Sequence, residues 1–221
     1  MFDRISGVYD RMNRVMTAGL DQTWRERAAD RVRLEPGQSA LDLCSGTGDL
    51  ALALAERVGP EGRVVGADFS RPMLELADVK ARNFGVAQVE FEWADTLDLP
   101  YEDESFDAVT ISFGARNLAD LPKGLSEMYR VLKPGGSLAI LEITQPSRQP
   151  LASFFVLWFD RIVPLLGKFA GDSSAYEYLP QSVRSFPDAG ALADHMDAAG
   201  FRHIRWTLMA GSIIALHSGV R

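Results

Sequence analysis

The chain has 221 residues, a length that suits one large α/β domain with a substantial core. Hydrophobic residues make up 47% of the chain and charged residues 24%, which is typical of a globular enzyme. The formal net charge of −7 disfavours a general nucleic-acid-binding protein, because such proteins need a basic face to neutralise phosphates. We therefore expect no nucleic-acid partner.

Cysteine and histidine usage disfavours a disulfide-bonded or metal-binding protein. Cys44 is the single cysteine, so it cannot form an internal disulfide, and we expect it to act as a small core residue. His195, His203 and His217 are scattered without the spacing of a zinc site, so we predict no metal. The N-terminus lacks the apolar run of a secretory signal, which favours a cytoplasmic protein.

The longest apolar stretch is LASFFVLWF at residues 151–159. A helix that spans a bilayer needs about 20 apolar residues, so this stretch is too short to cross one. Three interpretations stay open. The stretch can lie on a membrane surface as a peripheral contact, line an apolar pocket, or pack in the core.

The elements follow a regular order along the chain. In residues 1–35 apolar residues recur at helical spacing, which predicts a helical cap of two helices separated at Gly19. From residue 40 onward, apolar strands alternate with glycine-containing turns and helices. The predicted strands are residues 40–44, 64–68, 89–93, 108–112, 137–143, 204–209 and 212–217, and the predicted helices are 50–58, 72–84, 121–132 and 189–199.

This alternation predicts a doubly wound, mainly parallel α/β sheet with helices on both faces. The last two strands are joined by Ala210 and Gly211, a link too short for a parallel crossover, so we expect them to pair antiparallel. Residues 145–187 interrupt the rhythm and are predicted to form a lid or substrate-binding insertion. The whole chain, residues 1–221, is predicted to be a single domain.

A glycine-rich turn follows the first predicted strand. Its sequence, LDLCSGTGDL, places Gly46, Thr47 and Gly48 between Asp42 of the strand and the start of a helix. Glycines in such a turn let the backbone approach a ligand closely. In open α/β sheets ligands bind outside the carboxyl ends of the strands, where this turn lies.

Acidic residues near the turn distinguish two nucleotide-like cofactors. Asp68 ends the second predicted strand, where a carboxylate can accept hydrogen bonds from ribose hydroxyls of either a nicotinamide dinucleotide or S-adenosylmethionine. Asp49 stands where a dinucleotide would place its pyrophosphate, which favours the phosphate-free sulfonium cofactor. The alternatives are that Asp49 is only a helix N-cap and that Asp68 is only a turn residue.

A third acidic residue, Asp95, follows the third predicted strand. A carboxylate there can accept a hydrogen bond from the adenine amine, with the base held against apolar residues such as Phe69 and Met73. Acidic residues at successive strand ends therefore predict S-adenosylmethionine as the cofactor.

This arrangement resembles the class I S-adenosylmethionine-dependent methyltransferases over residues 36–219, including a Lys-Pro-Gly-Gly turn at 133–136 before the fifth strand. The resemblance implies a seven-stranded sheet whose last strand is inserted antiparallel. Further motifs are similar to the menaquinone/ubiquinone biosynthesis C-methyltransferases and follow that family's order along nearly the whole chain. They are MFDRISGVYDRMN at 1–13, GLDQTWR at 19–25, ISFGARN at 111–117 and YEYLPQSVRSFP at 176–187.

The resemblance implies C-methylation of a polyprenylated quinol ring, most simply of demethylmenaquinol to menaquinol. It implies catalytic roles for Arg116 and Asn117 on the oxygen side of the quinol, and for Tyr9 and Asn13 from the N-terminal helix. The predicted cofactor-binding residues are Asp42, Gly46, Thr47, Gly48, Asp68, Asp95, Thr96 and Ser112.

Several alternatives accompany these predictions. Arg116 can serve only as a salt-bridge partner, Asn117 can cap the helix that follows it, and Tyr176 and Tyr178 can simply pack the insertion. The acceptor can instead be a polyprenyl benzoquinol or another small molecule. Two further rivals are a nicotinamide-dependent oxidoreductase and a non-catalytic module that retains a cofactor fold. The sequence does not indicate the oligomeric state.

Overall fold

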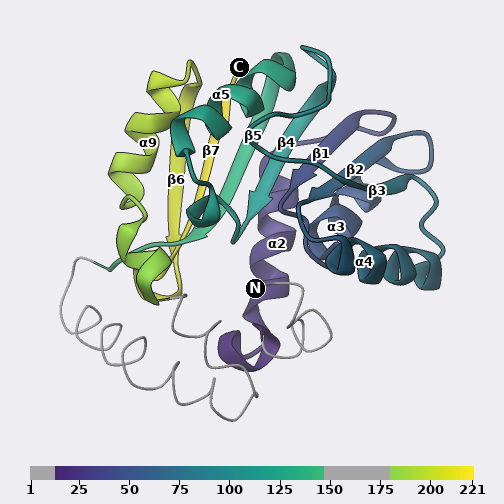
Figure 1. The fold of residues 1–221 in the computed structure, drawn as a ribbon, viewed down its shortest axis with the longest axis horizontal. Helices are drawn as coiled ribbons and strands as arrows, with labels where there is room; N and C mark the ends of the chain where they lie inside the picture. The colour runs from purple at the N-terminus through teal and green to yellow at the C-terminus, as the bar shows by residue number, and fades with distance from the viewer. Residues whose placement is uncertain (1–12, 147–179) are drawn as a thin grey trace.

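A seven-stranded sheet in the order β3-β2-β1-β4-β5-β7-β6 forms the centre of the molecule (Figure 1). The structure, a computed structural model, describes residues 13–146 and 180–221. Strands β3, β2, β1, β4 and β5 run parallel, whereas β7 pairs antiparallel with both β5 and β6. The predicted doubly wound fold with an inserted antiparallel last strand is therefore confirmed.

Strands and helices alternate along the chain as predicted, and residues 13–17 and 180–185 are helical as well. The strands are β1 (Ser39–Leu43), β2 (Arg63–Asp68), β3 (Val89–Trp93), β4 (Phe106–Ser112), β5 (Leu132–Ile143), β6 (Arg202–Met209) and β7 (Ile214–Val220). The helices are α2 (Leu20–Arg31), α3 (Asp49–Val58), α4 (Arg71–Phe84), α5 (Leu121–Val131) and α9 (Ala189–Ala198), with single 3-10 turns at η1 (Ala115–Asn117) and η3 (Ala210–Ser212).

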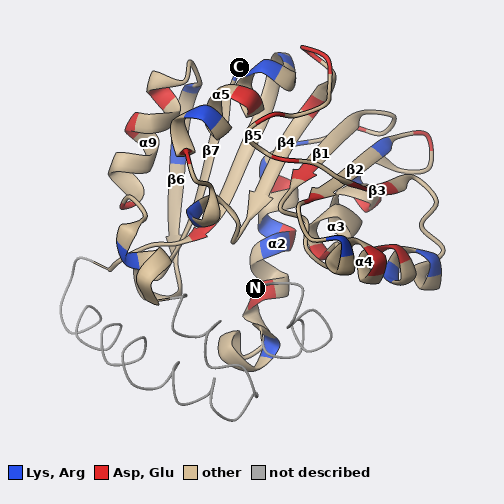
Figure 2. Ribbon diagram, viewed as in Figure 1, with Lys and Arg blue, Asp and Glu red and all other residues tan. Residues whose placement is uncertain are grey.

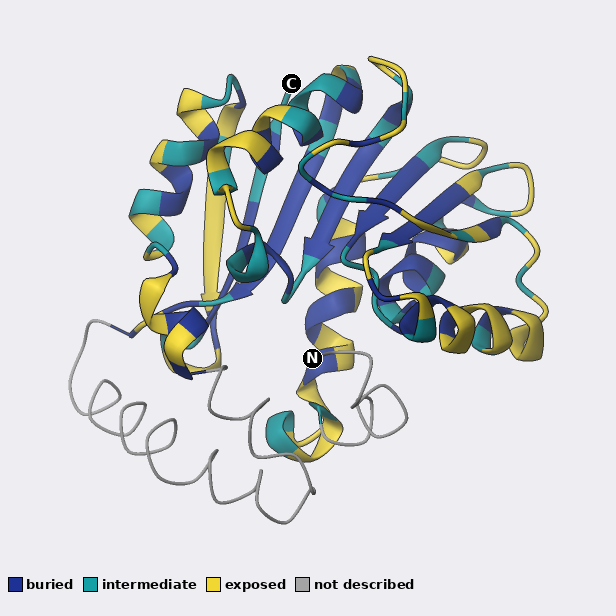
Figure 3. Cartoon of the chain, in the orientation of Figure 1, coloured by how far each residue is buried: buried dark blue, intermediate teal, exposed yellow. Residues whose placement is uncertain are grey.

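Two apolar cores cover the two faces of the sheet. Because side chains alternate along a strand, Leu41 and Leu43 of β1 face one core, whereas Ala40 faces the other. The first core is closed by α5 and α9, and the second by α2 and α3. Figure 3 shows the central strands buried and the outer surfaces of the helices exposed. The sheet thus provides a rigid platform whose strand ends position the loops.

The N-terminal helices separate where predicted. Gly19 has a φ of 78° and precedes α2, so the helix at 13–17 cannot continue unbroken into α2. Most of the predicted insertion at 145–187, including the apolar stretch at 151–159, lies outside the described residues. So do Tyr9, Tyr176 and Tyr178.

The predicted starts of the last three strands are wrong, and β6 begins at Arg202 rather than residue 204. The Lys-Pro-Gly-Gly segment at 133–136 lies inside β5, where it forms a bulge opposite β4 and bonds to the C-terminal residue Arg221. The last strand begins at Ile214 rather than residue 212 and extends to Val220, because residues 210–212 form the turn η3. The antiparallel pairing that this short link predicted is unaffected.

Charged side chains lie mainly on helices and loops, and both signs are interspersed along α4 (Figure 2). Among residues 13–146 and 180–221, no helix combines the length and apolar composition that crossing a membrane requires.

Gly48, the last residue of the glycine turn, packs tightly against Phe91 and Ala77. Its φ is 84°, and an added Cβ would lie 2.6 Å from the Phe91 ring and 3.1 Å from the Ala77 Cβ. We expect Gly48→Ala to lower the free energy of unfolding by about 2–4 kcal/mol, through left-handed backbone strain and overpacking. Urea denaturation followed by circular dichroism measures this loss.

Gly85 provides the matched control, because its φ is 69° and no atom lies within 4 Å of an added Cβ. Gly85→Ala should show the backbone strain alone, about 1–2 kcal/mol. Equal losses in the two variants would contradict the proposed close packing against Phe91.

Candidate active site

A cavity of about 420 Å³ opens at the carboxyl ends of β1, β2, β3 and β4. This volume falls in the range of small-molecule and cofactor sites. The position is the one that ligands occupy in open α/β sheets. The cavity is lined by Cys44, Gly46, Asp68, Phe69, Met73, Ala94, Asp95, Thr96, Leu97, Ser112, Phe113, Gly114, Asn117, Leu118 and Ala119.

Asp68 joins the glycine turn to the end of β2. Its Oδ2 accepts a hydrogen bond of 2.8 Å from the Gly46 amide, and its Oδ1 accepts one of 2.8 Å from the Ser70 amide. Each carboxylate oxygen can accept a further hydrogen bond. The carboxylate therefore holds the turn in place and can still accept the ribose hydroxyls of a cofactor.

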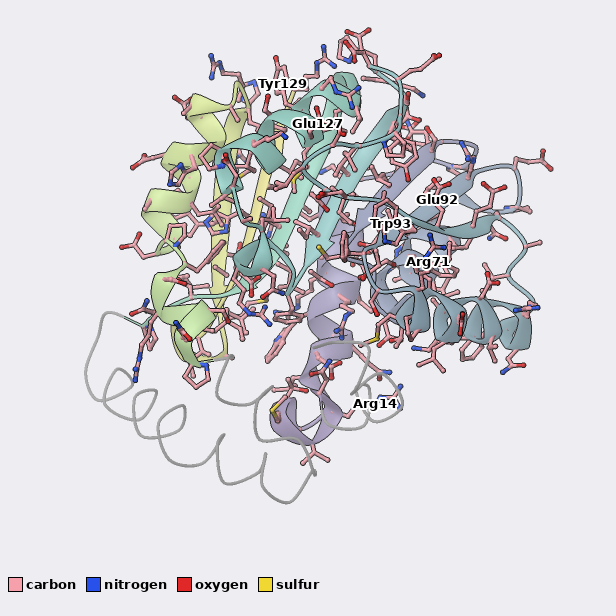
Figure 4. The ribbon with its side chains drawn as sticks, viewed as in Figure 1. Arg14, Arg71, Glu92, Trp93, Glu127 and Tyr129 are labelled. Carbon is pink, nitrogen blue, oxygen red and sulfur yellow. The ribbon has the colours of Figure 1, made fainter. Side chains whose placement is uncertain are left out.

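The part of the cavity next to the ends of β2 and β3 combines a carboxylate with apolar walls. Asp95 Oδ1 accepts a hydrogen bond of 2.9 Å from the Leu97 amide, which fixes the loop after β3. Phe69 and Met73 both line the cavity, as predicted for residues that hold an adenine. The exposed Phe69 ring lies 5.2 Å from Trp93, which in turn lies 5.9 Å from the Arg71 guanidinium (Figure 4). Thr96, the neighbour of Asp95, is buried in the same wall.

Asp42 lies in β1 behind the cavity and is not one of its lining residues. Its carboxyl oxygens accept hydrogen bonds from Ser45 Oγ (2.7 Å) and Thr110 Oγ1 (2.8 Å). Burial raises the pKa of Asp42 to about 7, and these two hydrogen bonds offset part of that effect. The structure thus places Asp42 where it can support the turn from beneath.

Asp49 is compensated by basic residues. Its Oδ1 lies 2.6 Å from the Lys80 ammonium, which also donates to Thr47 Oγ1 at 3.1 Å, and its Oδ2 lies 4.0 Å from Arg25. Gly48 is the N-cap of α3 and Asp49 is its first residue, so the alternative that Asp49 is only a helix N-cap is wrong. Because Lys80 and Arg25 balance its charge, Asp49 excludes a phosphate less strongly than the sequence suggested.

The end of β4 and the turn after it form a further part of the cavity wall. Ser112 and Asn117 line it, and between them the chain turns through Phe113 at a φ of 56° into η1. Asp120 caps α5 by accepting from the Lys123 amide, so the alternative that Asn117 caps this helix is wrong. Asn117 thus lines the cavity without capping α5.

Arg116 takes a different position from its neighbour. It is not a lining residue; its Nη1 lies 2.7 Å from Oε1 of Glu142, a buried residue of β5, and 2.5 Å from the Phe113 carbonyl oxygen. The salt bridge weighed as an alternative role for Arg116 is therefore present. Sequence reasoning missed Glu142, whose only signal is an acidic residue inside an apolar strand.

The N-terminal helical segment contacts the cavity wall through α2, because two residues of α2 lie beside the cavity-lining residue Phe113. The Arg25 guanidinium lies 5.4 Å from the centre of the Phe113 ring and 2.5 Å from Asp21 Oδ2, and Trp24 packs 6.4 Å from the same ring. Asn13 stands in the preceding helix, where its carbonyl oxygen accepts from Thr17. It is not among the residues that line the cavity.

Cys44 lines the cavity beside Thr96. Burial raises the pKa of its thiol to about 12, so the thiol stays protonated at neutral pH. This agrees with the prediction that Cys44 serves as a small core residue. Among the described residues, no group of acidic, histidine and cysteine side chains could hold a metal ion.

The residues present fit S-adenosylmethionine. The carboxylates of Asp68 and Asp95 line the cavity and have oxygens that can accept hydrogen bonds from hydroxyl and amine groups, and Phe69 and Met73 supply an apolar wall. Acidic residues in the cavity also suit a ligand with a positively charged sulfur.

Comparisons with known proteins match the whole chain and not only the residues of the cavity. The model of the ubiE/COQ5 methyltransferase family matches residues 1–221. A demethylmenaquinone methyltransferase of Thermus thermophilus is 46% identical over 222 residues, with 100% of both chains covered. One of Listeria monocytogenes is 40% identical, with 100% of this chain and 94% of the relative covered.

Solved structures show the same fold at low identity. A SAM-dependent methyltransferase from Aquifex aeolicus matches with a TM-score of 0.66 and 21% identity over 89% of this chain and 88% of that one. The [4+2]-cyclase SpnF matches with a TM-score of 0.70 and 20% identity over 90% of this chain and 80% of that one. The fold therefore does not specify the reaction, whereas the full-length match does assign the family. The chain belongs to the ubiE/COQ5 methyltransferase family and is an S-adenosylmethionine-dependent methyltransferase.

Proposed function

We propose that this protein methylates a ring carbon of a polyprenylated quinol, converting demethylmenaquinol to menaquinol. Two full-length relatives carry the name demethylmenaquinone methyltransferase. The observation that carries the proposal is a cavity lined both by Asp68 and Asp95, from the ends of β2 and β3, and by Asn117, from η1 after β4. The two acidic residues suit the cofactor, and Asn117 suits the hydroxyl group of an acceptor.

The reaction needs an electron-rich ring carbon in line with an electrophilic methyl group. S-Adenosylmethionine supplies, when bound, a methyl group activated by its positive sulfur. Loss of a hydroxyl proton pushes electron density onto the quinol ring carbon, which forms the new C–C bond as the S–C bond breaks. The ring carbon then releases its own proton, which restores the aromatic ring, and the phenolate oxygen takes up a proton from solvent to give the methylated quinol. Alignment and stabilisation of the phenolate are what the chain must contribute.

The cofactor contacts are proposed as follows. Asp68 holds the ribose and Asp95 the adenine amine, while Thr96 and Ser112 contact the cofactor from the cavity wall. Gly46, Thr47 and Gly48 form the turn beside the amino-acid part of the cofactor. Asp42 contributes through Ser45, since its own carboxyl group lies behind the cavity.

On the acceptor side, Asn117 is proposed to hold a quinol hydroxyl, because it lines the cavity next to the end of β4. Arg116 is proposed to stabilise the phenolate by its positive charge from behind the same turn. Tyr9 and Asn13 are proposed to complete the acceptor site from the N-terminal helix.

Transfer of labelled methyl to chemically reduced demethylmenaquinone and to a demethylated polyprenyl benzoquinol tests the proposal. Ring methylation of the naphthoquinol is the expected result. Preferential methylation of the benzoquinol would assign the protein to ubiquinone biosynthesis instead of menaquinone biosynthesis. No transfer to either, with cofactor binding shown by calorimetry, would defeat the quinol assignment.

Asn117→Ala should lower kcat for the quinol about tenfold, while the Kd for S-adenosylmethionine changes less than about twofold. One hydrogen bond to the reacting oxygen is worth about 1.4 kcal/mol, which is tenfold in rate. Single-turnover kinetics at saturating cofactor measure the effect. Unchanged kcat would remove Asn117 from the acceptor site.

We further propose that the protein works in the cytoplasm with peripheral contact to a membrane, because a polyprenylated quinol partitions into lipid. Comparing methyl transfer to quinol in vesicles and in detergent, together with co-sedimentation, tests this contact. Absence of the protein from the vesicle pellet under turnover conditions would contradict it.

A further inference from the structure

A buried ion pair lies directly behind the turn that presents Asn117. Both side chains are buried, with 1% of Glu142 and 8% of the Arg116 side chain exposed. Oε1 of Glu142 lies 2.7 Å from Nη1 of Arg116. The same carboxylate accepts backbone hydrogen bonds, at Oε1 from the Ile143 amide (2.7 Å) and at Oε2 from the Arg116 amide (3.2 Å). Glu142 therefore binds both the side chain and the backbone of Arg116.

This pair anchors a turn that is held from two sides. At its start, Gly114 packs so closely against Cys44 at the end of β1 that an added Cβ would lie 2.3 Å from the Cys44 Cβ. At its end, the Asn117 amide donates to the Gly114 carbonyl oxygen at 3.0 Å. The middle of the turn is Arg116, which Glu142 ties to β5. The contact between Arg116 and Glu142 therefore lies in the same short turn that places Asn117 in the cavity wall.

One buried nitrogen of the Arg116–Glu142 pair has no hydrogen-bond partner among the described residues. A salt bridge that only stabilised the fold would not require such a donor. Nη1 of Arg116 bonds to Glu142 and to the Phe113 carbonyl oxygen, yet its Nε is buried without a hydrogen-bond partner among the described residues. An unsatisfied buried donor opposes folding. Such costs are concentrated at functional sites, where the arrangement serves the reaction.

We infer that Glu142 is a positioning residue for methyl transfer, which sets the orientation of the Arg116 guanidinium and the place of Asn117 through their shared turn. This inference rests on the proposed quinol methylation. Because Glu142 is buried behind the turn and outside the cavity lining, it acts through Arg116 and does not touch the acceptor itself. Small displacements of positioned groups can lower a rate about 100-fold.

A double-mutant cycle with Glu142→Gln and Arg116→Gln tests the inference on the full-length protein. Glu142→Gln keeps the size of the side chain, so we expect kcat to fall about 10- to 100-fold, with the Kd for S-adenosylmethionine changed less than about twofold. The double variant should be slower than Arg116→Gln by much less than the full loss in Glu142→Gln, because only the backbone contact to position 116 then remains to be weakened. Losses that multiply in the double variant, or an unchanged kcat in Glu142→Gln, would overturn the inference.

Glu127 on α5 supplies a matched control (Figure 4). It also pairs with an arginine, Arg130, at 2.7 Å and accepts a backbone hydrogen bond, from Leu99 at 2.8 Å, but it is not a cavity-lining residue. Glu127→Gln should leave kcat within about twofold of the unmodified protein. If Glu142→Gln does not fold, Glu142→Asp keeps the charge but shortens its reach, and it should show the same selective loss of kcat.

A readout without turnover separates this inference from the proposed function. In ¹⁵N-resolved spectra, Glu142→Gln should shift the Arg116 Nε–H and the Asn117 side-chain amide signals, whereas Glu127→Gln should leave both in place. If the unmodified protein methylates no quinol, the proposed function fails, and these shifts still decide whether Glu142 positions the turn. Unchanged signals in Glu142→Gln would overturn the inference whatever the acceptor is.

Discussion

Asp68→Asn should raise the Kd for S-adenosylmethionine about 100-fold or more. The carboxylate accepts from Gly46 at one oxygen and from Ser70 at the other, so an amide must turn its NH₂ toward one of these donors. The variant thereby loses a charge-assisted hydrogen bond in the turn and an acceptor for the ribose, together about 3 kcal/mol. Isothermal titration calorimetry of the folded variant measures the change.

Asp120→Asn is the control for this effect. Asp120 accepts a backbone hydrogen bond from Lys123 as the N-cap of α5, and it is not a cavity-lining residue. Asparagine is a comparably good N-cap, so the control should keep its stability and its cofactor affinity. Equal affinities in Asp68→Asn and the unmodified protein would show that Asp68 supports only the loop and does not bind ribose.

The sheet could be predicted because its determinants are local. Apolar strands, turn glycines and helical spacing recur in short windows, and the two-residue link at Ala210 and Gly211 was enough to require an antiparallel pair. The Lys-Pro-Gly-Gly segment was assigned to a turn because its local sequence is typical of one. It lies in β5 instead, because its backbone bonds to Arg221, which is distant in sequence.

The acidic strand ends could also be predicted, since parallel strands bring their carboxyl ends to one edge of the sheet. Asp68, Asp95 and Ser112 do meet at one cavity. Asp42 belongs to the same motif but faces Ser45 and Thr110 inside the protein. Its direction depends on the pairing of β1 with β4, which a motif in one strand does not contain.

The ion pairs could not be predicted, because they join residues far apart in the chain. Lys80 compensates Asp49 from 31 positions away, and Glu142 binds Arg116 from 26 positions away. A sequence shows that Asp49 is negative but not that a lysine lies 2.6 Å from it. Charge-based arguments from sequence are therefore weakest where a fold brings opposite charges together, as it does on both sides of this site.

The buried Asp42 leads to a second large effect, on the pH dependence of stability. Burial raises the pKa of this carboxyl group from its ordinary value near 3.8 to about 7. Between about pH 4 and pH 7 the native carboxyl group keeps its proton while the unfolded chain releases it. The free energy of unfolding should therefore fall as pH rises through this window, by up to about 4 kcal/mol for this group.

Asp42→Asn isolates this contribution, because an amide does not titrate and can still accept from one hydroxyl while it donates to the other, whose proton rotates away. The pKa values of Asp107 and Glu127 are lowered, so these groups stabilise the fold as pH rises, but they do so equally in both proteins. Relative to the unmodified protein, Asp42→Asn should gain about 2–3 kcal/mol between pH 5 and pH 8 in urea denaturation. Parallel pH profiles would mean that Ser45, Thr110 and the nearby charge of Arg25 outweigh burial and keep Asp42 ionised at neutral pH.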